Sequence, residues 1–457
     1  MVNVYRVIVI FLSIISIIAS LVSTSNIPIN LVLIPLIFLI LFIVFPSFSR
    51  YMFYNLGITI INFTMLLRYV VSPLLMAIYG SNIQIGSSVS MVIQGKAVNL
   101  MLYEMIVLFV IFAIFHKYFY SNKTEFQNIK SRPNLFGWLF VAFTLTLVAL
   151  FPTSIGRYAF LWSASELKND VTADVGLTAL LVQIAQIVIT LGLLNVIYKF
   201  YERKPNISYL FLSLFVIMVS ASFIIGTSRS SIIIPLITGL YTVFILYKNY
   251  RKLIIIISAI LSLLVISVST LLKQNTNIVT ARGLYHSAGA LENFNTDVQI
   301  YFSGLINISH SIETSFVYQP FHINSILGDI THSVIFVNSF FDGFQSALIS
   351  FNDMFYKKVG VSDQILPLLG QGYLYFGAIL APMFSIIVLF VVMLLDKNIH
   401  NSNSVFTLYV YAYLCLKFAL FFMSNATILL SFFTNFFLVL FIIAVLNKKF
   451  VVRRRTK

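Results

Sequence analysis

The sequence predicts an all-α polytopic membrane protein with about 12 transmembrane helices and one large extracytoplasmic loop between the ninth and tenth spans. Of the 457 residues, 60% are hydrophobic and 9% are charged, whereas soluble domains carry about 25% charged residues. A chain this poor in charge cannot cover a water-facing surface. Apolar runs of about 20 residues, long enough to cross a bilayer, recur along the chain and stop between Leu271 and Pro367.

Twelve apolar segments are the expected spans, nine before this interruption and three after it. They are Val4–Val22, Ile29–Phe45, Leu56–Tyr79, Ala97–Phe119, Leu135–Phe151, Gly176–Phe200, Ile207–Ile225, Ser231–Tyr247, Leu253–Leu271, Leu368–Leu395, Val405–Met423 and Ile428–Leu446. The first has no small-residue cleavage site before Ser23, so it is expected to be a retained helix. The chain then divides into a nine-span region (1–271), the loop with amphipathic helices (272–367), a three-span region (368–447) and a basic cytoplasmic tail (448–457).

The distribution of charge predicts the orientation of these spans. With the N-terminus in the cytoplasm, 19 of the 29 Lys and Arg residues fall on the cytoplasmic side and 8 fall outside, as the positive-inside rule requires. Both termini are therefore expected in the cytoplasm and the long loop outside the plasma membrane. The basic residues are scattered through short loops, which makes nucleic acid a poor partner, whereas the tail suits an anionic inner leaflet.

Three ionisable side chains lie inside the expected spans, where a charge costs about 2.5–3.5 kcal/mol on the insertion scale. Arg68 and Glu104 lie in consecutive antiparallel spans, so they could pair inside the bundle. Such a pair would either fix helix packing or form a wall of a substrate-binding cavity. Lys417 is expected to extend its ammonium group toward the membrane surface.

Three arginines are expected at the outer membrane surface. Arg229 lies in the small-residue break "IIGTSRSSIII", where hydroxyls and amides surround a planar guanidinium that suits phosphate oxygens. Arg157 and Arg282 each neighbour a glycine and an aromatic residue. The three could bind a lipid pyrophosphate together, or they could be ordinary turn and loop charges.

The long loop carries four of the six histidines, His286, His310, His322 and His332, in no spacing typical of a metal site. A histidine beside a carboxylate can act as a general base near neutral pH. Phenylalanines at near-helical spacing predict an amphipathic helix, packed on the bundle or serving as a sugar platform. They are Phe336, Phe340, Phe344, Phe351 and Phe355. The single cysteine, Cys415, excludes a disulfide or a cysteine-rich metal site.

Several segments resemble bacterial oligosaccharide repeat-unit polymerases, the Wzy-type O-antigen and capsule polymerases. They are "LLRYVVSPLL", "NLMLYEMIVLF", "GTSRSSIIIPLI", "VQIYFSGLINISHSIE" and "QILPLLGQGYLYFGAILAPMF", in this order from the third span to the tenth. Two features depart from the family pattern. No outer arginine is followed eleven positions later by glycine, and Gln371 stands where many relatives have an acidic residue.

The resemblance implies a glycosyltransferase that joins undecaprenyl-pyrophosphate-linked oligosaccharides at the outer face of the plasma membrane, without metal or cofactor. Its further partners can include a chain-length regulator and a flippase. Arg229 would stabilise the leaving pyrophosphate, and the base would be one of four residues. The catalytic candidates are Arg229, His310, Asp297, Glu313 and His332, and the substrate-binding candidates are Arg68, Glu104, Arg157, Arg282 and Tyr301.

Two other functions stay open at this point. A polysaccharide ligase of the O-antigen ligase type has a similar size, a large loop and outer arginines. A lipid-linked oligosaccharide flippase or another transporter also fits twelve spans with intramembrane charge, but it does not explain a long outer loop.

Overall fold

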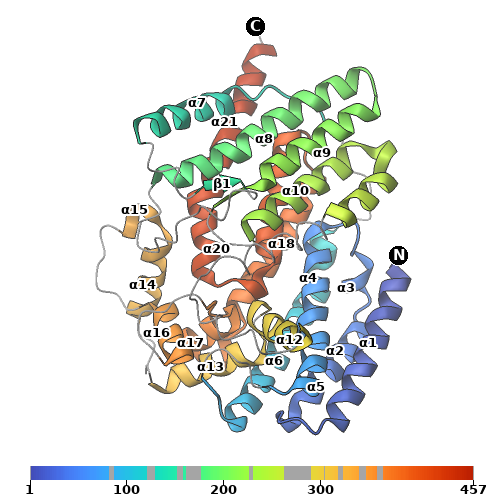
Figure 1. The fold of residues 1–457 in the computed structure, drawn as a ribbon, viewed down its shortest axis with the longest axis vertical. Helices are drawn as coiled ribbons and strands as arrows, with labels where there is room; N and C mark the ends of the chain where they lie inside the picture. Colours follow the sequence, from blue (N-terminus) through green and yellow to red (C-terminus); the bar gives the residue numbers. More distant parts are fainter. Residues whose placement is uncertain are drawn as a thin grey trace. The chain divides into compact units, whose positions relative to one another are not determined.

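The computed structural model is helical, with one short two-stranded antiparallel ribbon (Figure 1). It describes residues 2–81, 87–120, 129–151, 158–160, 177–225, 230–261, 290–302, 304–317, 323–338, 346–357 and 364–455. The ribbon pairs β1 (Tyr158–Phe160) with β2 (Phe223–Ile225). The expected predominantly helical fold is thus observed.

Two compact units, each built from three stretches of the chain, make up the fold. The first comprises Met1–Asn122, Val279–Asp396 and Lys417–Phe432, and the second comprises Lys123–Ile278, Lys397–Leu416 and Phe433–Lys457.

The first part of the chain forms a series of helices interrupted by short turns. These elements are α1 (Val2–Val22), η1 (Ile29–Val32), α2 (Leu33–Val44), α3 (Ser47–Arg50), α4 (Leu56–Leu66), η2 (Leu67–Val71), α5 (Ser72–Tyr79), α6 (Met91–Phe119), α7 (Leu135–Leu150), α8 (Leu177–Arg203), α9 (Ile207–Ser222), α10 (Ser230–Leu246) and η5 (Lys248–Tyr250).

Helices also fill the described parts of the polar segment and the C-terminal region. They are α12 (Ala290–Tyr301), α13 (Leu305–Val317), α14 (Ile323–Ser333), α15 (Ile335–Asn338), α16 (Ala347–Tyr356), α17 (Leu368–Leu380), α18 (Met383–His400), α19 (Val405–Ala419), η7 (Phe421–Met423), α20 (Ala426–Phe432), η8 (Phe433–Phe437) and α21 (Leu438–Arg455).

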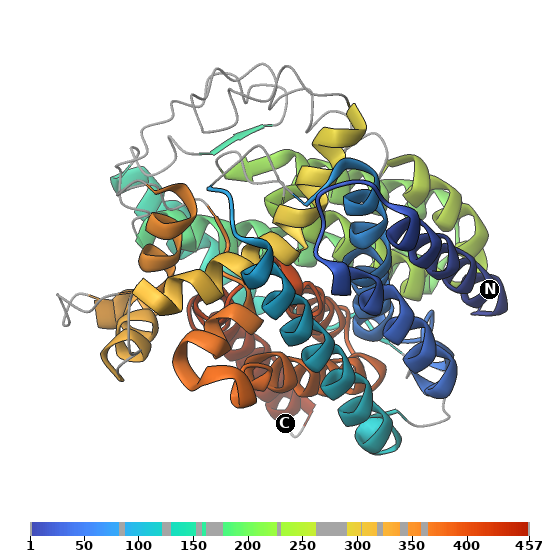
Figure 2. The same ribbon diagram turned by 90° about the horizontal axis from the view of Figure 1, so that it is seen from below.

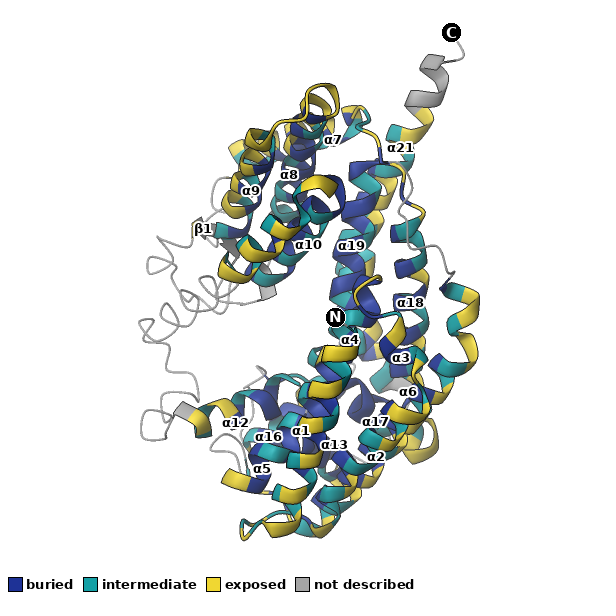
Figure 3. Cartoon of the chain, turned by 90° about the vertical axis from the view of Figure 1, so that its right-hand side faces the viewer, coloured by how far each residue is buried: buried dark blue, intermediate teal, exposed yellow. Residues whose placement is uncertain are grey.

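Six described helices are long and apolar enough to cross a membrane, and the bent pair Ile232–Leu246 and Lys248–Leu261 would make a seventh. Five more apolar helices are shorter. On α1, large apolar side chains such as Phe11 are exposed, whereas Ser13 and Ser16 are fully buried. Figure 3 shows both exposed and buried positions along the helices. Apolar residues outside and polar residues within a helix bundle are typical of a protein whose solvent is lipid.

The expected single span Leu368–Leu395 is wrong, because the chain breaks there into α17 and α18. Gly377 ends regular helix geometry with a φ of 74° and a ψ of −173°, a combination that essentially only glycine adopts. Gly372 then packs so closely on the returning chain that an added Cβ would overlap the carbonyl oxygen of Ala381. The sequence "FGAILAPMF" therefore encodes a fold-back and not a continuous helix.

The polar segment 272–367 contributes packed helices wherever the structure describes it. Phe351 and Phe355 on α16 are fully buried in a cluster with Ile306 of α13 and Leu374 of α17. This confirms the helical packing expected for these two residues, while Phe340 and Phe344 lie outside the described residues. In place of one amphipathic helix, the structure has the separate helices α15 and α16.

A buried carboxylate fixes the beginning of α4. Asp396 on α18 accepts the backbone N–H groups of Gly57 and Ile58 at 2.8 and 3.1 Å, and the Tyr120 hydroxyl at 3.0 Å. The first N–H groups of a helix lack partners within the helix and favour a negative charge. Asp396 thereby ties α18 to α4, although the two are more than 300 positions apart in the chain.

Candidate functional site

The site in the first unit is built around α13, a polar helix with a buried side. Ser309, Ser311 and Thr314 are fully buried, and each hydroxyl donates to the carbonyl oxygen four residues before it. This local bonding satisfies the hydroxyls and lets a polar helix pack inside the protein. α13 lies against α6, α16 and α17 (Figures 1 and 2).

On this helix, His310 and Glu313 form a pair, with Nδ1 of the histidine 3.2 Å from Oε2 of the glutamate. Residues three apart share a helix face, so the spacing in "HSIE" brings them together. The hydrogen bond with His310 lowers the pKa of Glu313, with a further contribution from the charge of Lys357. A carboxylate that accepts a hydrogen bond from Nδ1–H favours the neutral tautomer in which Nε2 carries a lone pair.

An aromatic ring packs beside the imidazole of His310. The His310 ring centroid lies 4.7 Å from that of Phe355 on α16, and the side chain is fully buried. Nε2 has no hydrogen-bond partner among the described residues. The pair thus presents an oriented imidazole with a vacant acceptor nitrogen, which is the arrangement of a general base.

A second buried acid lies on α14. Asp329 accepts a 2.5 Å hydrogen bond from Ser346 on one oxygen, and it accepts bonds from Gln371 and the Tyr375 hydroxyl on the other. Burial raises the pKa of Asp329, against the opposing effect of these hydrogen bonds. Gln371 also accepts the backbone N–H of Ala426 at 2.8 Å, so the cluster joins α14, α17 and α20.

Asp329 was not among the residues that sequence patterns selected. It is one of many acidic residues in the polar segment, and no motif surrounds it. The one pointer in the sequence was Gln371, which stands where the family resemblance leads one to expect an acid. The structure places the carboxylate of Asp329 3.1 Å from the Gln371 amide nitrogen.

The helix that carries the His310–Glu313 pair touches α17, whose residues Gln371 and Tyr375 bond Asp329. An added Cβ at Gly370 would overlap the hydroxyl of Ser311, so α13 and α17 approach as closely as glycine permits. Ser311 follows His310 in the chain, and Gly370 precedes Gln371. The His310–Glu313 pair and the Asp329 cluster therefore belong to one polar region of the first unit.

The expected intramembrane pair is confirmed. Arg68 Nη2 lies 2.9 Å from Glu104 Oε2, and both side chains are 1% exposed. Glu104 also accepts hydrogen bonds from Tyr69 (3.2 Å) and Ser385 (2.6 Å), and the guanidinium lies over the Phe422 ring. With so many local partners, the pair holds four helical segments together. Its expected contact with substrate stays a prediction.

Arg68 sits in η2, a π-helical turn between α4 and α5. Such turns leave backbone carbonyls without their usual helical partners and are frequent at functional sites. Here Ser16 of α1 donates to the carbonyl oxygen of Val70 at 2.9 Å. The Arg68 Nε is buried without a hydrogen-bond partner among the described residues.

The remaining predicted residues are dispersed or lie outside the described residues. Asp297 and Tyr301 are half-buried on α12, and His332 is exposed on α14. Arg157, Arg229 and Arg282 fall outside the described ranges. Lys417 is half-buried with its ammonium nitrogen 5.7 Å from the centroid of the Phe432 ring.

Within the parts of the chain that the structure describes, no group of three His, Cys, Asp or Glu side chains could hold a metal ion. Comparison with known proteins adds no relative, because no family model, curated protein or solved structure matches this chain. The chemistry of the site therefore rests on the geometry of its own residues.

Proposed function

We propose that this protein polymerises oligosaccharide repeat units linked to undecaprenyl pyrophosphate at the outer face of the plasma membrane. The proposal includes twelve membrane crossings, both termini in the cytoplasm and the 272–367 segment outside. The helical membrane fold supports it, as do the resembling segments and the buried acid–base groups in that polar segment.

The observation that carries the proposal is the His310–Glu313 pair. A polymerase must remove a proton from an acceptor hydroxyl, and an imidazole oriented by a carboxylate is suited to that task. Glu313 occupies Nδ1, and Nε2 is left without a partner among the described residues. A transporter that is not coupled to proton movement does not require a base of this kind.

In the proposed reaction, Nε2 of His310 accepts the proton as the hydroxyl oxygen of one repeat unit attacks the anomeric carbon of the growing chain. The bond between that carbon and the lipid pyrophosphate breaks, and the pyrophosphate leaves with the electron pair. Outer cations stabilise this charge, a role proposed for Arg229 with Arg157 and Arg282. Because His310 is fully buried beside Phe355, the acceptor reaches Nε2 only when the side chains that cover it move.

Asp329 has a supporting part in this proposal. Its pKa is raised by burial, so the carboxyl holds a proton more readily than an exposed one. Protonated or charged, it orders Gln371 and Tyr375 beside α13. We assign it to positioning of the polar region, while His310 is the base.

The test is the product that accumulates when the residue is removed. Cells with His310→Ala should carry single repeat units on the lipid carrier at the outer face and no long polymer, with normal membrane levels of the protein. His332→Ala changes the other histidine among the candidate bases, which is exposed on α14; it is the comparison variant and should retain the polymer ladder. Repeat units held at the inner face would instead identify a flippase, and polymer of normal length in His310→Ala would remove His310 from the mechanism.

A further inference from the structure

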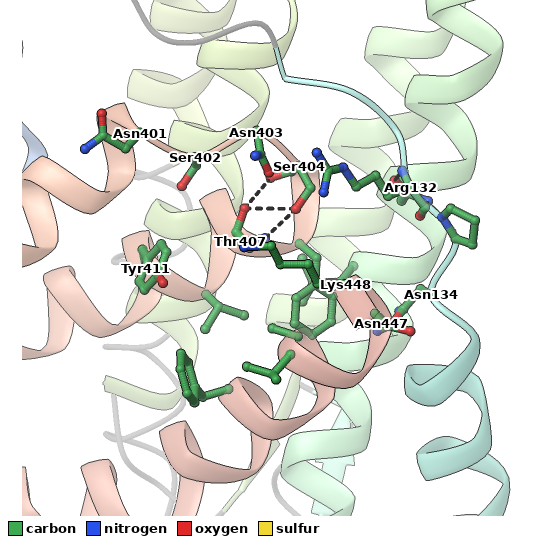
Figure 4. A pocket seen from close by; sticks show the side chains of 18 residues that line it. Arg132, Asn134, Asn401, Ser402, Asn403, Ser404, Thr407, Tyr411, Asn447 and Lys448 are labelled. Atoms are coloured by element: carbon green, nitrogen blue, oxygen red, sulfur yellow. Dashed lines mark hydrogen bonds between the residues drawn. The ribbon is translucent and has the colours of Figure 1, made fainter. Parts of the chain in front are cut away.

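A pocket in the second unit is lined by none of the residues described for the site in the first unit. Its volume is about 370 Å³, within the range of small-molecule binding sites. Four stretches of chain line it: residues 132–134, α8, the 401–411 stretch at the start of α19, and α21 (Figure 4).

Hydrogen bonds between distant segments build the walls of this pocket. The side-chain amide of Asn195 on α8 exchanges two hydrogen bonds with the backbone of Arg132, at 3.1 and 2.8 Å. Asn447 on α21 accepts the backbone N–H of Phe136 and donates to Asn134. Lys130 donates its backbone N–H to the carbonyl oxygen of Asn403. These hydrogen bonds fix the walls of the pocket to one another.

Its polar side is rich in donors. Arg132 and Lys448 bring two positive charges, and no acidic residue is among those that line the pocket. Figure 4 shows both side chains extending toward Ser404 and Thr407, where α19 begins. Neither cation has an ion-pair partner among the described residues. The N-terminus of α19, a 15-residue helix, adds a favourable dipole for an anion, although Ser404 already accepts the backbone N–H of Thr407.

One lining side chain is left with an unused donor. Asn134 is 7% exposed, and its Nδ2 has no hydrogen-bond partner among the residues that the structure describes. Gly137 makes the room for this amide, because an added Cβ would overlap it. An unsatisfied buried donor costs about 1–3 kcal/mol, so the Asn134 side chain would gain free energy by turning its amide nitrogen toward a ligand that accepts the hydrogen bond.

The opposite side of the pocket is apolar. Leu191, Val410, Phe441, Ala444 and Val445 line it. A free inorganic anion would leave this surface uncovered, whereas a ligand with a charged head and a hydrocarbon tail would cover both sides. In the proposed topology this end of the second unit lies at the cytoplasmic leaflet, whose anionic lipids bind in basic pockets between membrane helices.

We propose that this pocket binds the phosphate group of an anionic membrane lipid, with the lipid tail against the apolar side. Arg132 offers a planar fork to the phosphate oxygens, and Lys448 offers a compact charge. This inference uses the proposed membrane orientation but does not depend on polymerase activity.

Three probes separate the parts of the ligand. The full-length protein in a maltoside detergent is titrated with dioctanoyl phosphatidic acid, with dioctanoyl glycerol and with inorganic phosphate, and bound lipid is counted by native mass spectrometry. Phosphatidic acid should bind at least about tenfold more tightly than the glyceride, which has the same tails without the phosphate. Equal binding of the two lipids would overturn the proposal. Inorganic phosphate that binds as tightly as phosphatidic acid would show a free anion site and overturn the lipid assignment.

Charge removal tests the residues themselves. The double variant Arg132→Gln/Lys448→Gln should lose phosphatidic acid binding by at least about tenfold. Lys449→Gln removes a charge one position further on, outside the pocket lining, and should bind as the unaltered protein does. Unchanged binding in the double variant would exclude this pocket. Because the comparison of lipids uses the unaltered protein, a variant that fails to fold leaves the proposal still testable. These experiments measure lipid binding and not polymer length, so a negative result would overturn the lipid site without bearing on the proposed polymerase activity.

Discussion

Removal of Arg68 should destabilise the first unit more than removal of any exposed arginine. In Arg68→Met the carboxylate of Glu104 stays buried and keeps its bonds from Tyr69 and Ser385, but it loses its only ion-pair partner among the described residues. Breaking a buried ion pair by deleting one partner costs about 3–5 kcal/mol. We therefore expect the free energy of unfolding to fall by about that amount.

The companion variant separates charge from packing. Arg68→Met/Glu104→Gln removes both charges, and replacement of a whole buried pair is often neutral, so most of the lost stability should return. The assay is equilibrium denaturation of the purified protein in mild detergent. Arg50→Met, which changes an exposed residue at the end of α3, is the control and should stay within about 0.5 kcal/mol. An Arg68→Met protein as stable as this control would refute the reasoning.

Three further outcomes follow from the geometry. Gly372→Ala should lower the melting temperature, because the added Cβ overlaps the Ala381 carbonyl; an unchanged value would contradict the fold-back. Asp396→Ala should lower the free energy of unfolding by about 1–2 kcal/mol, because α4 loses its cap. A loss below about 0.5 kcal/mol, the size typical of a surface substitution, would argue against the cap. Because the pKa of Glu313 is lowered from its ordinary value of 4.5, its pairing with His310 stabilises the protein above that pH, and this stability is lost as the pH falls through the folded-state pKa. The melting-temperature difference between the unaltered protein and Glu313→Gln should therefore shrink on acidification, and a constant difference would exclude the pair as its source.

Some of this architecture was predictable because it depends on neighbours in the chain. Arg68 and Glu104 lie in consecutive antiparallel helices, so a charge in each has little alternative to pairing. His310 and Glu313 are three residues apart, and helix geometry alone places them on one face. The burial of Phe351 and Phe355 follows from the same periodicity.

Other features depend on contacts that no local pattern records. The fold-back after α17 needs Gly372 beside the carbonyl of Ala381, and hydropathy treats these apolar residues as one long helix. Asp329 becomes notable only through Ser346 and Gln371, which come from other helices. The basic pocket likewise assembles from stretches separated by up to about 300 positions, and none of its asparagines stands in a recognisable motif.

The most direct test of the proposed base is polymerisation by the purified protein in liposomes. With lipid-pyrophosphate-linked repeat units as the substrate, the unaltered protein should produce a ladder of polymer, and His310→Ala should slow its growth by about 100- to 10,000-fold, the usual contribution of a general base. His332→Ala should retain the rate of the unaltered protein. A His310→Ala protein that is folded and polymerises at the full rate would contradict the assignment of His310, and an unaltered protein that moves the repeat units across the bilayer without joining them would contradict the polymerase itself.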